Sequence, residues 1–152
     1  MAEDTEASTG YAGEVFLSTD STVANLTELV EVVSFSLPSD TAERVETTHL
    51  KSPNRRREYT TGMIDPGELE VTLNFRPGTD TDLLIEAALT SGDLRAVRFN
   101  IPELGVLKYT YDTTVTVLGY DKGEVTADGK MEATVTLAVS GAVTASAYTP
   151  PA

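Results

Sequence analysis

The 152-residue chain contains no cysteine, no tryptophan and a single histidine, His49. Without cysteine it cannot form a disulfide, a thiolate metal site or a cysteine nucleophile. The chain also has no Gly-x-Ser-x-Gly segment, the strand-to-helix turn that carries the nucleophile of many serine hydrolases. We therefore assign His49 a structural or interface role and predict that the protein is not an enzyme.

Positive charge and long apolar runs are also scarce. The chain has 11 basic and 24 acidic residues, which gives a net charge of −13. Such a chain repels phosphate backbones, which argues against ordinary nucleic-acid binding. No stretch approaches the roughly 18 apolar residues of a membrane helix, and no glycine pattern fits a phosphate-binding loop. We expect no membrane insertion, no specific DNA binding and no cofactor.

Carboxylates are abundant, and two acidic chemistries stay open at this point. A glycosidase-like pair of carboxylates is compatible with the sequence, although solvated surface acids explain the same residues more simply. Asp80 and Asp82 resemble part of a calcium loop but lack the glycine and glutamate that such a loop needs. We assign both residues to the capping of a helix.

Hydrophobic periodicity predicts about seven strands and one helix. The clearest alternation runs from Glu68 to Phe75, with Leu69, Val71, Leu73 and Phe75 on one face. The other expected strands cover residues 14–19, 29–37, 44–49, 97–101, 106–118 and 130–140. The pattern indicates a mainly β protein, an antiparallel β-sandwich or barrel with one flanking α-helix and a long inter-strand loop.

The helix is expected from Thr79 to Ser91, with Gly92 as its C-terminal stop. Leu83, Leu84, Ala87 and Ala88 fall on one face at helical spacing, and we predict that this face is buried. We expect one domain over residues 1–152, with a flexible N-terminal arm (1–13), a long loop (51–62) and a C-terminal tail (142–152).

The long loop concentrates the chain's positive charge in the run Arg55-Arg56-Arg57. One interpretation is a solvated loop tip. The other is an assembly arm, because an identical subunit offers a large acidic surface and such complementary patches produce head-to-tail association. We expect the loop to be disordered in the free subunit and ordered in the assembly. The candidate interface residues are His49, Leu50, Lys51, Ser52, Pro53, Asn54, Arg55, Arg56, Arg57, Glu58 and Tyr59.

The order of three motifs resembles the major tail tube proteins of long-tailed bacteriophages. These motifs are Val45–Pro53, then Arg57-Glu58-Tyr59, then Gly62–Leu69, and the segments Leu83–Gly92 and Thr134–Gly141 are also similar. The resemblance implies the tail tube fold and a structural virion protein. In that family, subunits form hexameric rings that stack into a hollow tube, which conducts DNA to the host cell.

The resemblance also implies partners and a location. The chain is expected to bind itself, the tape measure protein, and the tail tip and tail terminator proteins. DNA passes through the tube without specific binding. The expected location is the virion tail, with the host cytoplasm during assembly.

An acidic lumen would repel a passing phosphate backbone and prevent it from sticking. Alternating strands with threonine and glutamate on their second face suit a water-lined channel. The candidate lumen residues are therefore Glu68, Glu70, Thr72, Asn74, Glu132, Thr134 and Thr136.

Two alternatives remain at this stage. One is the inner tube of a contractile injection or type VI secretion machine, which has a similar fold. The other is a monomeric β-sandwich binding module, which requires exposed aromatic platforms. Aromatic residues make up only 7% of the chain, and this composition disfavours such a module.

Overall fold

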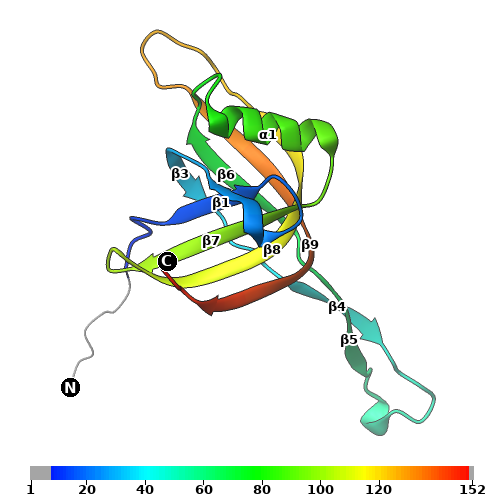
Figure 1. The fold of residues 1–152 in the computed structure, drawn as a ribbon. Helices are drawn as coiled ribbons and strands as arrows, with labels where there is room; N and C mark the ends of the chain where they lie inside the picture. The colour runs from blue at the N-terminus through cyan, green and yellow to red at the C-terminus, as the bar shows by residue number, and fades with distance from the viewer. Residues whose placement is uncertain (1–7, 151–152) are drawn as a thin grey trace.

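Seven strands form one curled antiparallel sheet, and two further strands project from it as a separate hairpin (Figure 1). The computed structural model describes residues 8–150. The elements within this range are β1 (Glu14–Ser18), η1 (Val23–Asn25), β2 (Leu26–Glu28), β3 (Val32–Phe35), β4 (Thr41–Glu46), η2 (Pro53–Arg55), β5 (Tyr59–Asp65), β6 (Glu68–Asn74), α1 (Asp80–Ser91), β7 (Arg95–Glu103), β8 (Val106–Asp121) and β9 (Glu132–Ala147). No helix among them is long and apolar enough to cross a membrane.

The main sheet has the strand order β2-β1-β7-β8-β9-β6-β3. Its two central strands, β8 and β9, have 16 residues each, and their pairing shifts register between Asp112 and Thr114 and again between Val117 and Gly119. Irregularities of this kind bend a strand and increase its twist. The sheet therefore curls until its two halves enclose one core, which confirms the predicted mainly β fold with one flanking helix.

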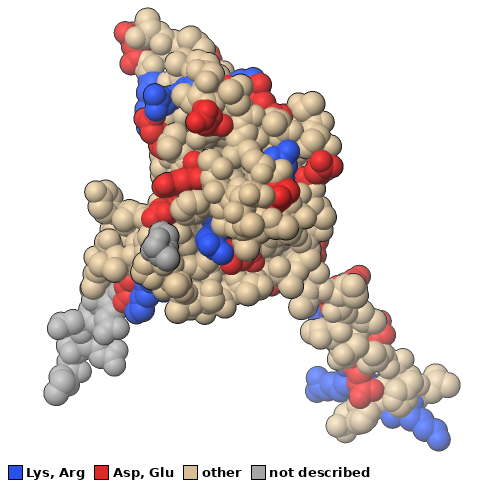
Figure 2. Space-filling model, in the orientation of Figure 1, with Lys and Arg blue, Asp and Glu red and all other residues tan. Residues whose placement is uncertain are grey.

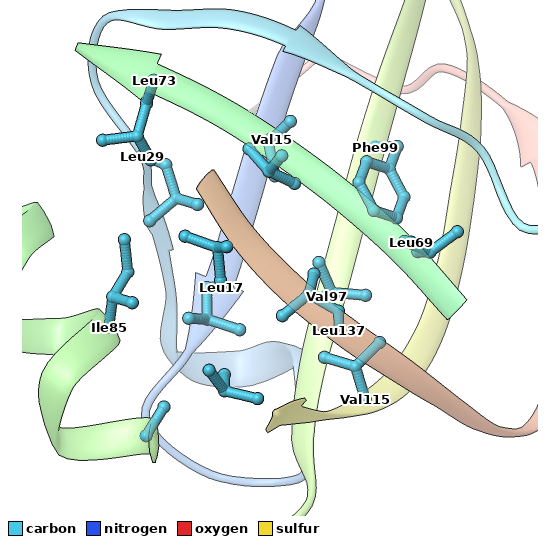
Figure 3. Packing of buried hydrophobic residues seen from close by; sticks show 14 of the residues in the cluster. Val15, Leu17, Leu29, Leu69, Leu73, Ile85, Val97, Phe99, Val115 and Leu137 are labelled. Atoms are coloured by element: carbon cyan, nitrogen blue, oxygen red, sulfur yellow. The ribbon is translucent and has the colours of Figure 1, made fainter. Parts of the chain in front are cut away.

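The core lies inside this curl, where side chains from β1, β6, β7 and β9 converge (Figure 3). Leu69, Val71 and Leu73 are buried on β6, as its alternating sequence predicts. On the facing half, the ring of Phe99 stacks on Phe35 at a centroid distance of 5.4 Å. These core strands therefore contribute apolar side chains to the inside of the curl.

Helix α1 covers one open end of the curled sheet (Figure 1). Its predicted ends are confirmed, because the Thr79 side chain accepts a hydrogen bond from the amide of Asp82, and Gly92 ends the helix at φ 68°. The predicted face is wrong for two residues. Leu83 is 56% exposed and Ala87 is also exposed, whereas the buried residues are Thr81, Asp82, Ile85 and Ala88.

The hydroxyl of Tyr120 on β8 explains this rotation of the helix. It donates a hydrogen bond to Asp82 Oδ1 at 2.8 Å, so the Asp82 side of α1 faces the sheet. Burial and the neighbouring Asp82 carboxylate raise the pKa of Tyr120, so the hydroxyl keeps the proton that it donates. Ile85, which is fully buried, lies on the same side of the helix as Asp82.

Several predicted boundaries differ from the structure. The strand expected over 44–49 is β4, which ends at Glu46, and the strands expected over 97–101, 106–118 and 130–140 correspond to β7, β8 and β9 with other bounds. The expected C-terminal tail from residue 142 is wrong as far as Ala147, because β9 continues to that residue and pairs Ser146 with Thr110 of β8. The expected strand over 29–37 shortens to β3, with Val33 half exposed at the sheet edge. The predicted N-terminal arm lies partly outside the described residues, because the structure describes only residues 8–13 of it.

Candidate assembly surfaces

Strands β4 and β5 pair with each other in their own two-stranded sheet and form a hairpin that extends away from the body (Figure 1). We call residues 41–65 the hairpin arm and residues 47–58 the arm tip. The predicted loop over 51–62 is therefore wrong for residues 59–62, which belong to β5. Both faces of this hairpin are polar or mixed, so neither strand shows the apolar alternation that identifies a half-buried strand.

The arm tip is closed by a network of hydrogen bonds around Glu58. The Ser52 hydroxyl donates to Glu58 Oε2 at 2.7 Å, and the amide of Glu58 donates to Thr48 Oγ1 at 2.8 Å. His49 Nε2 lies 3.5 Å from the same Glu58 oxygen, and the His49 amide donates to Ser52 Oγ at 3.0 Å. These residues belong to the motifs Val45–Pro53 and Arg57-Glu58-Tyr59, so the two motifs together form the tip. His49 contributes to the structure of the tip.

The outermost turn of the arm tip contains two consecutive non-glycine residues in the left-handed region, Asn54 at φ 55° and Arg55 at φ 59°. Such residues are uncommon outside constrained turns, and each costs on the order of 1–3 kcal/mol. The amide of Arg56 closes the turn with a 3.1 Å hydrogen bond to the Pro53 carbonyl. These contacts define one conformation for the tip, and the disorder that we predict for the free subunit stays a prediction.

The hairpin arm exposes both cationic and apolar side chains. Figure 2 shows lysine and arginine gathered at its end, away from the body. Arg57 Nε lies 3.9 Å from Glu46, but within residues 8–150 neither Arg55 nor Arg56 has an ion-pair partner. Leu50 is fully exposed and Met63 is 82% exposed. An isolated two-stranded hairpin is only marginally stable in water.

A second polar surface covers the outside of β6 and β9. The register pairs Glu70 with Thr136, Thr72 with Thr134 and Asn74 with Glu132. The structure therefore brings the seven lumen candidates together on one face, with Glu68 at one end. Lys130 Nζ lies 3.2 Å from Glu132, whereas Glu68 and Glu70 have no ion-pair partner in the part of the chain described.

A hollow of about 390 Å³ lies on the outside of β1, β7 and β8 and was not expected from the sequence. Two of its charged groups form an ion pair: Arg98 donates two hydrogen bonds to Asp112 at 2.7 and 3.2 Å. The bonds to Asp112 raise the pKa of Arg98, so this ion pair is maintained. Beside it, the hydroxyl of Thr110 donates to the Asn100 side chain at 2.8 Å. Polar residues alternate along β7 and lie opposite polar residues of β8. This pattern is the sequence signal that could have predicted the surface.

The described residues contain no group of three or more His, Asp or Glu side chains placed to hold a metal ion. The described residues present a curled sheet, a projecting hairpin with arginines at its tip and an acidic sheet face, an arrangement suited to a structural protein that contacts other subunits. Residues 10–146 match the family model of the lambda phage tail tube protein. The chain therefore belongs to the lambda phage tail tube protein family, as the motif order predicted.

Solved structures of tube proteins share this fold. The tail of an empty gene transfer agent particle with C6 symmetry is 18% identical, with a TM-score of 0.70 over 91% of this chain and 98% of that one. The sheath–tube complex of the extracellular contractile injection system PVC is 11% identical, with a TM-score of 0.67 over 91% and 90%. The SPP1 tail tube is 14% identical, with a TM-score of 0.58 over 90% and 77%. No curated protein matches the chain.

Proposed function

We propose that this protein assembles into stacked hexameric rings, which form the hollow phage tail tube that conducts DNA to the host cell. The observation that carries the proposal is the hairpin arm, whose β4 residues are all exposed and whose tip bears unpaired arginines. Membership of the tail tube family and the tube assemblies among its structural neighbours support it.

The acidic face of β6 and β9 lines the lumen in this proposal. Glu68 and Glu70 carry negative charge, and Thr72, Thr134 and Thr136 supply neutral hydroxyl groups. A moving DNA backbone meets repulsion and uncharged polar groups there, and it finds no cluster of cations to which it could bind. DNA therefore passes without specific recognition.

The partners follow from the same proposal. The chain binds copies of itself, encloses the tape measure protein, and meets the tail tip and tail terminator proteins at the two ends of the tube. It acts in the virion tail after assembly in the host cytoplasm. It contributes a structural surface and no enzymatic activity, and it needs no cofactor.

A second candidate is the inner tube of a contractile machine, because the PVC sheath–tube complex and a type six secretion system protein share the fold. The two candidates differ in whether a sheath protein surrounds the tube. A sheath gene beside the gene for this chain would favour the contractile candidate, and its absence would favour the non-contractile tail.

Sedimentation velocity and negative-stain microscopy of the full chain test the proposal, first alone at high concentration and then with a nucleating tail complex. We expect rings or tubes in at least one condition. The variant R55S/R56S/R57S should lose them while its far-UV circular dichroism stays unchanged, because exposed tip residues contribute little to stability.

A matched control removes three positive charges from the body, in the variant R76S/K122S/K130S. Both triple variants change the net charge from −13 to −16, because each loses three of the chain's cations. We expect the control to assemble. If both variants assemble as the parent does, the arm is not the assembly contact; if the parent stays monomeric in both conditions, the tail tube function is wrong.

A further inference from the structure

The hairpin arm and helix α1 lie at opposite ends of the body (Figure 1). In a head-to-tail contact, a surface at one end of each copy meets a different surface at the other end of the next copy. An arm that extends from one end of a subunit therefore reaches the α1 end of its neighbour along the stack. The candidate receiving surfaces at that end are α1 and the β8–β9 loop (Figure 1).

The solvent side of α1 carries exposed apolar surface beside unpaired acids. Asp80, Leu83 and Ala87 follow one another at helical spacing on this side, and Asp93 lies just beyond the end of the helix. Leu83 is 56% exposed. Within residues 8–150, neither Asp80 nor Asp93 has an ion-pair partner. We call these four residues the outer α1 face.

The arm tip has the complementary pattern. Arg55 and Arg56 are cations without ion-pair partners among the described residues, and Leu50 beside them is fully exposed. Each surface thus combines an exposed leucine with two uncompensated charges, and the charges have opposite signs. The acids of α1 are about one helix length apart, roughly 18 Å for 12 residues, so each arginine can approach only one of them closely enough to escape screening by salt.

We propose that the arm tip of one copy docks on the outer α1 face of a second copy, with Leu50 beside Leu83 and with Arg55 and Arg56 between Asp80 and Asp93. This assignment rests on the proposed tube assembly and names its receiving surface. The contact covers apolar side chains that are otherwise exposed at both ends of the subunit. It also pairs the cations of the arm with acids that have no partner within their own chain.

The β8–β9 loop at the same end of the body is the rival receiver. It exposes Val125 and carries Glu124 and Asp128. The loop also contains Lys122 and Lys130, which form ion pairs with Glu86 of α1 and with Glu132. We favour the outer α1 face because its backbone is held by the hydrogen bonds of the helix, whereas residues 122–131 of the loop belong to no helix or strand.

A charge-swap series in the full chain tests the assignment. The variant R55E/R56E places acids against acids, and like-charge contacts at an interface cost several kcal/mol, so its tube yield should fall by at least about tenfold. Adding D80K/D93K to the same chain should restore the yield. Adding E124K/D128K should not restore it.

Rescue by E124K/D128K, or no rescue by D80K/D93K in a chain with parental circular dichroism, would overturn the assignment while leaving tube assembly intact. A parent that forms no tubes would instead overturn the proposed function and the assignment together. The two failures are therefore distinguishable in the same experiment.

Engineered disulfides give a second test that does not depend on charge. Because the chain has no cysteine, any crosslink comes only from introduced residues. Tubes of L50C/L83C should give a ladder of intermolecular disulfides after mild oxidation, and reductant should return it to monomer. Tubes of L50C/V125C should remain monomeric on a denaturing gel, and the opposite pattern would contradict the assignment.

Discussion

The Ser52 hydroxyl donates a 2.7 Å hydrogen bond to the carboxylate of Glu58, six residues later, and so closes the arm tip. The arm is separate from the main sheet, so this bond controls the shape of the tip without supporting the core. The proposed assembly contact and the core therefore lie in different parts of the molecule.

Glu58→Ala tests this separation. The substitution removes the acceptor of Ser52 and the neighbour of His49, so amide exchange across residues 47–58 should accelerate and assembly should weaken. The free energy of unfolding of the body should change by less than about 0.5 kcal/mol, as for most surface substitutions. Glu124→Ala in the exposed β8–β9 loop is the control and should alter neither property; equal exchange in Glu58→Ala and the parent would contradict the role of Glu58.

Tyr120→Phe tests how α1 is held against the sheet. The substitution leaves the buried carboxylate of Asp82 without its 2.8 Å donor from β8. Loss of a partner by a buried polar group costs about 1–3 kcal/mol, which chemical denaturation can measure. Tyr11→Phe, at a side chain that is 80% exposed, is the matched control. The same unfolding midpoint for both variants would show that the contact does not stabilise the helix.

Asp20 predicts a dependence of stability on acid pH. Hydrogen bonds from the Thr22 side chain and backbone, and from Asn25, lower the pKa of Asp20 to about 2. Because the pKa is lower in the folded state than its unfolded value of about 3.9, the stabilisation is present above pH 4 and is lost as the pH falls through about 2.

Thermal unfolding of the parent and of Asp20→Asn measures this effect. The parent should melt higher at pH 7, and the gap should close between pH 4 and pH 2, because protonation removes the negative charge that the variant already lacks. Asp128→Asn controls for the loss of one surface charge. A gap of the same size at pH 2 and pH 7 would argue against a titrating Asp20.

The predicted lumen can be tested by charge reversal with E70K/E132K, on the outer face of β6 and β9. Lysines there attract the DNA backbone, so ejection through assembled tubes should slow. The slowing should be greater at low salt, where the screening length grows from about 8 Å at 0.15 M to about 30 Å at 0.01 M. The variant E124K/D128K makes the same change in charge on the β8–β9 loop and should eject normally; no effect of E70K/E132K would remove these residues from the lumen.

Period-two alternation made the body of the molecule predictable. Leu69, Val71 and Leu73 are buried while Glu68 and Glu70 are exposed, because only one face of β6 meets the core. The same alternation predicts that the lumen candidates of β6 share one face of that strand, and the pairing of β6 with β9 adds Glu132, Thr134 and Thr136 to it. The strand order and the curl could not be inferred, because they depend on pairing between distant segments.

The arm and the outer α1 face were harder to predict for a shared reason. Every residue of β4 is exposed in the described structure, so the sequence of the hairpin arm carries no inward face to detect. On α1, two stripes fit helical spacing, and the buried one contains Ile85, Ala88 and the contact between Asp82 and Tyr120. In the proposed assembly, both surfaces expose apolar residues that a neighbouring copy covers. A rule that assigns apolar residues to the core of a single chain therefore misplaces them.

A cryo-EM reconstruction of the assembled protein tests the central claim most directly. The account predicts a hollow tube in which every arm tip, residues 47–58, contacts a neighbouring copy. A tube in which the arm folds back on its own subunit and touches no other copy would contradict it.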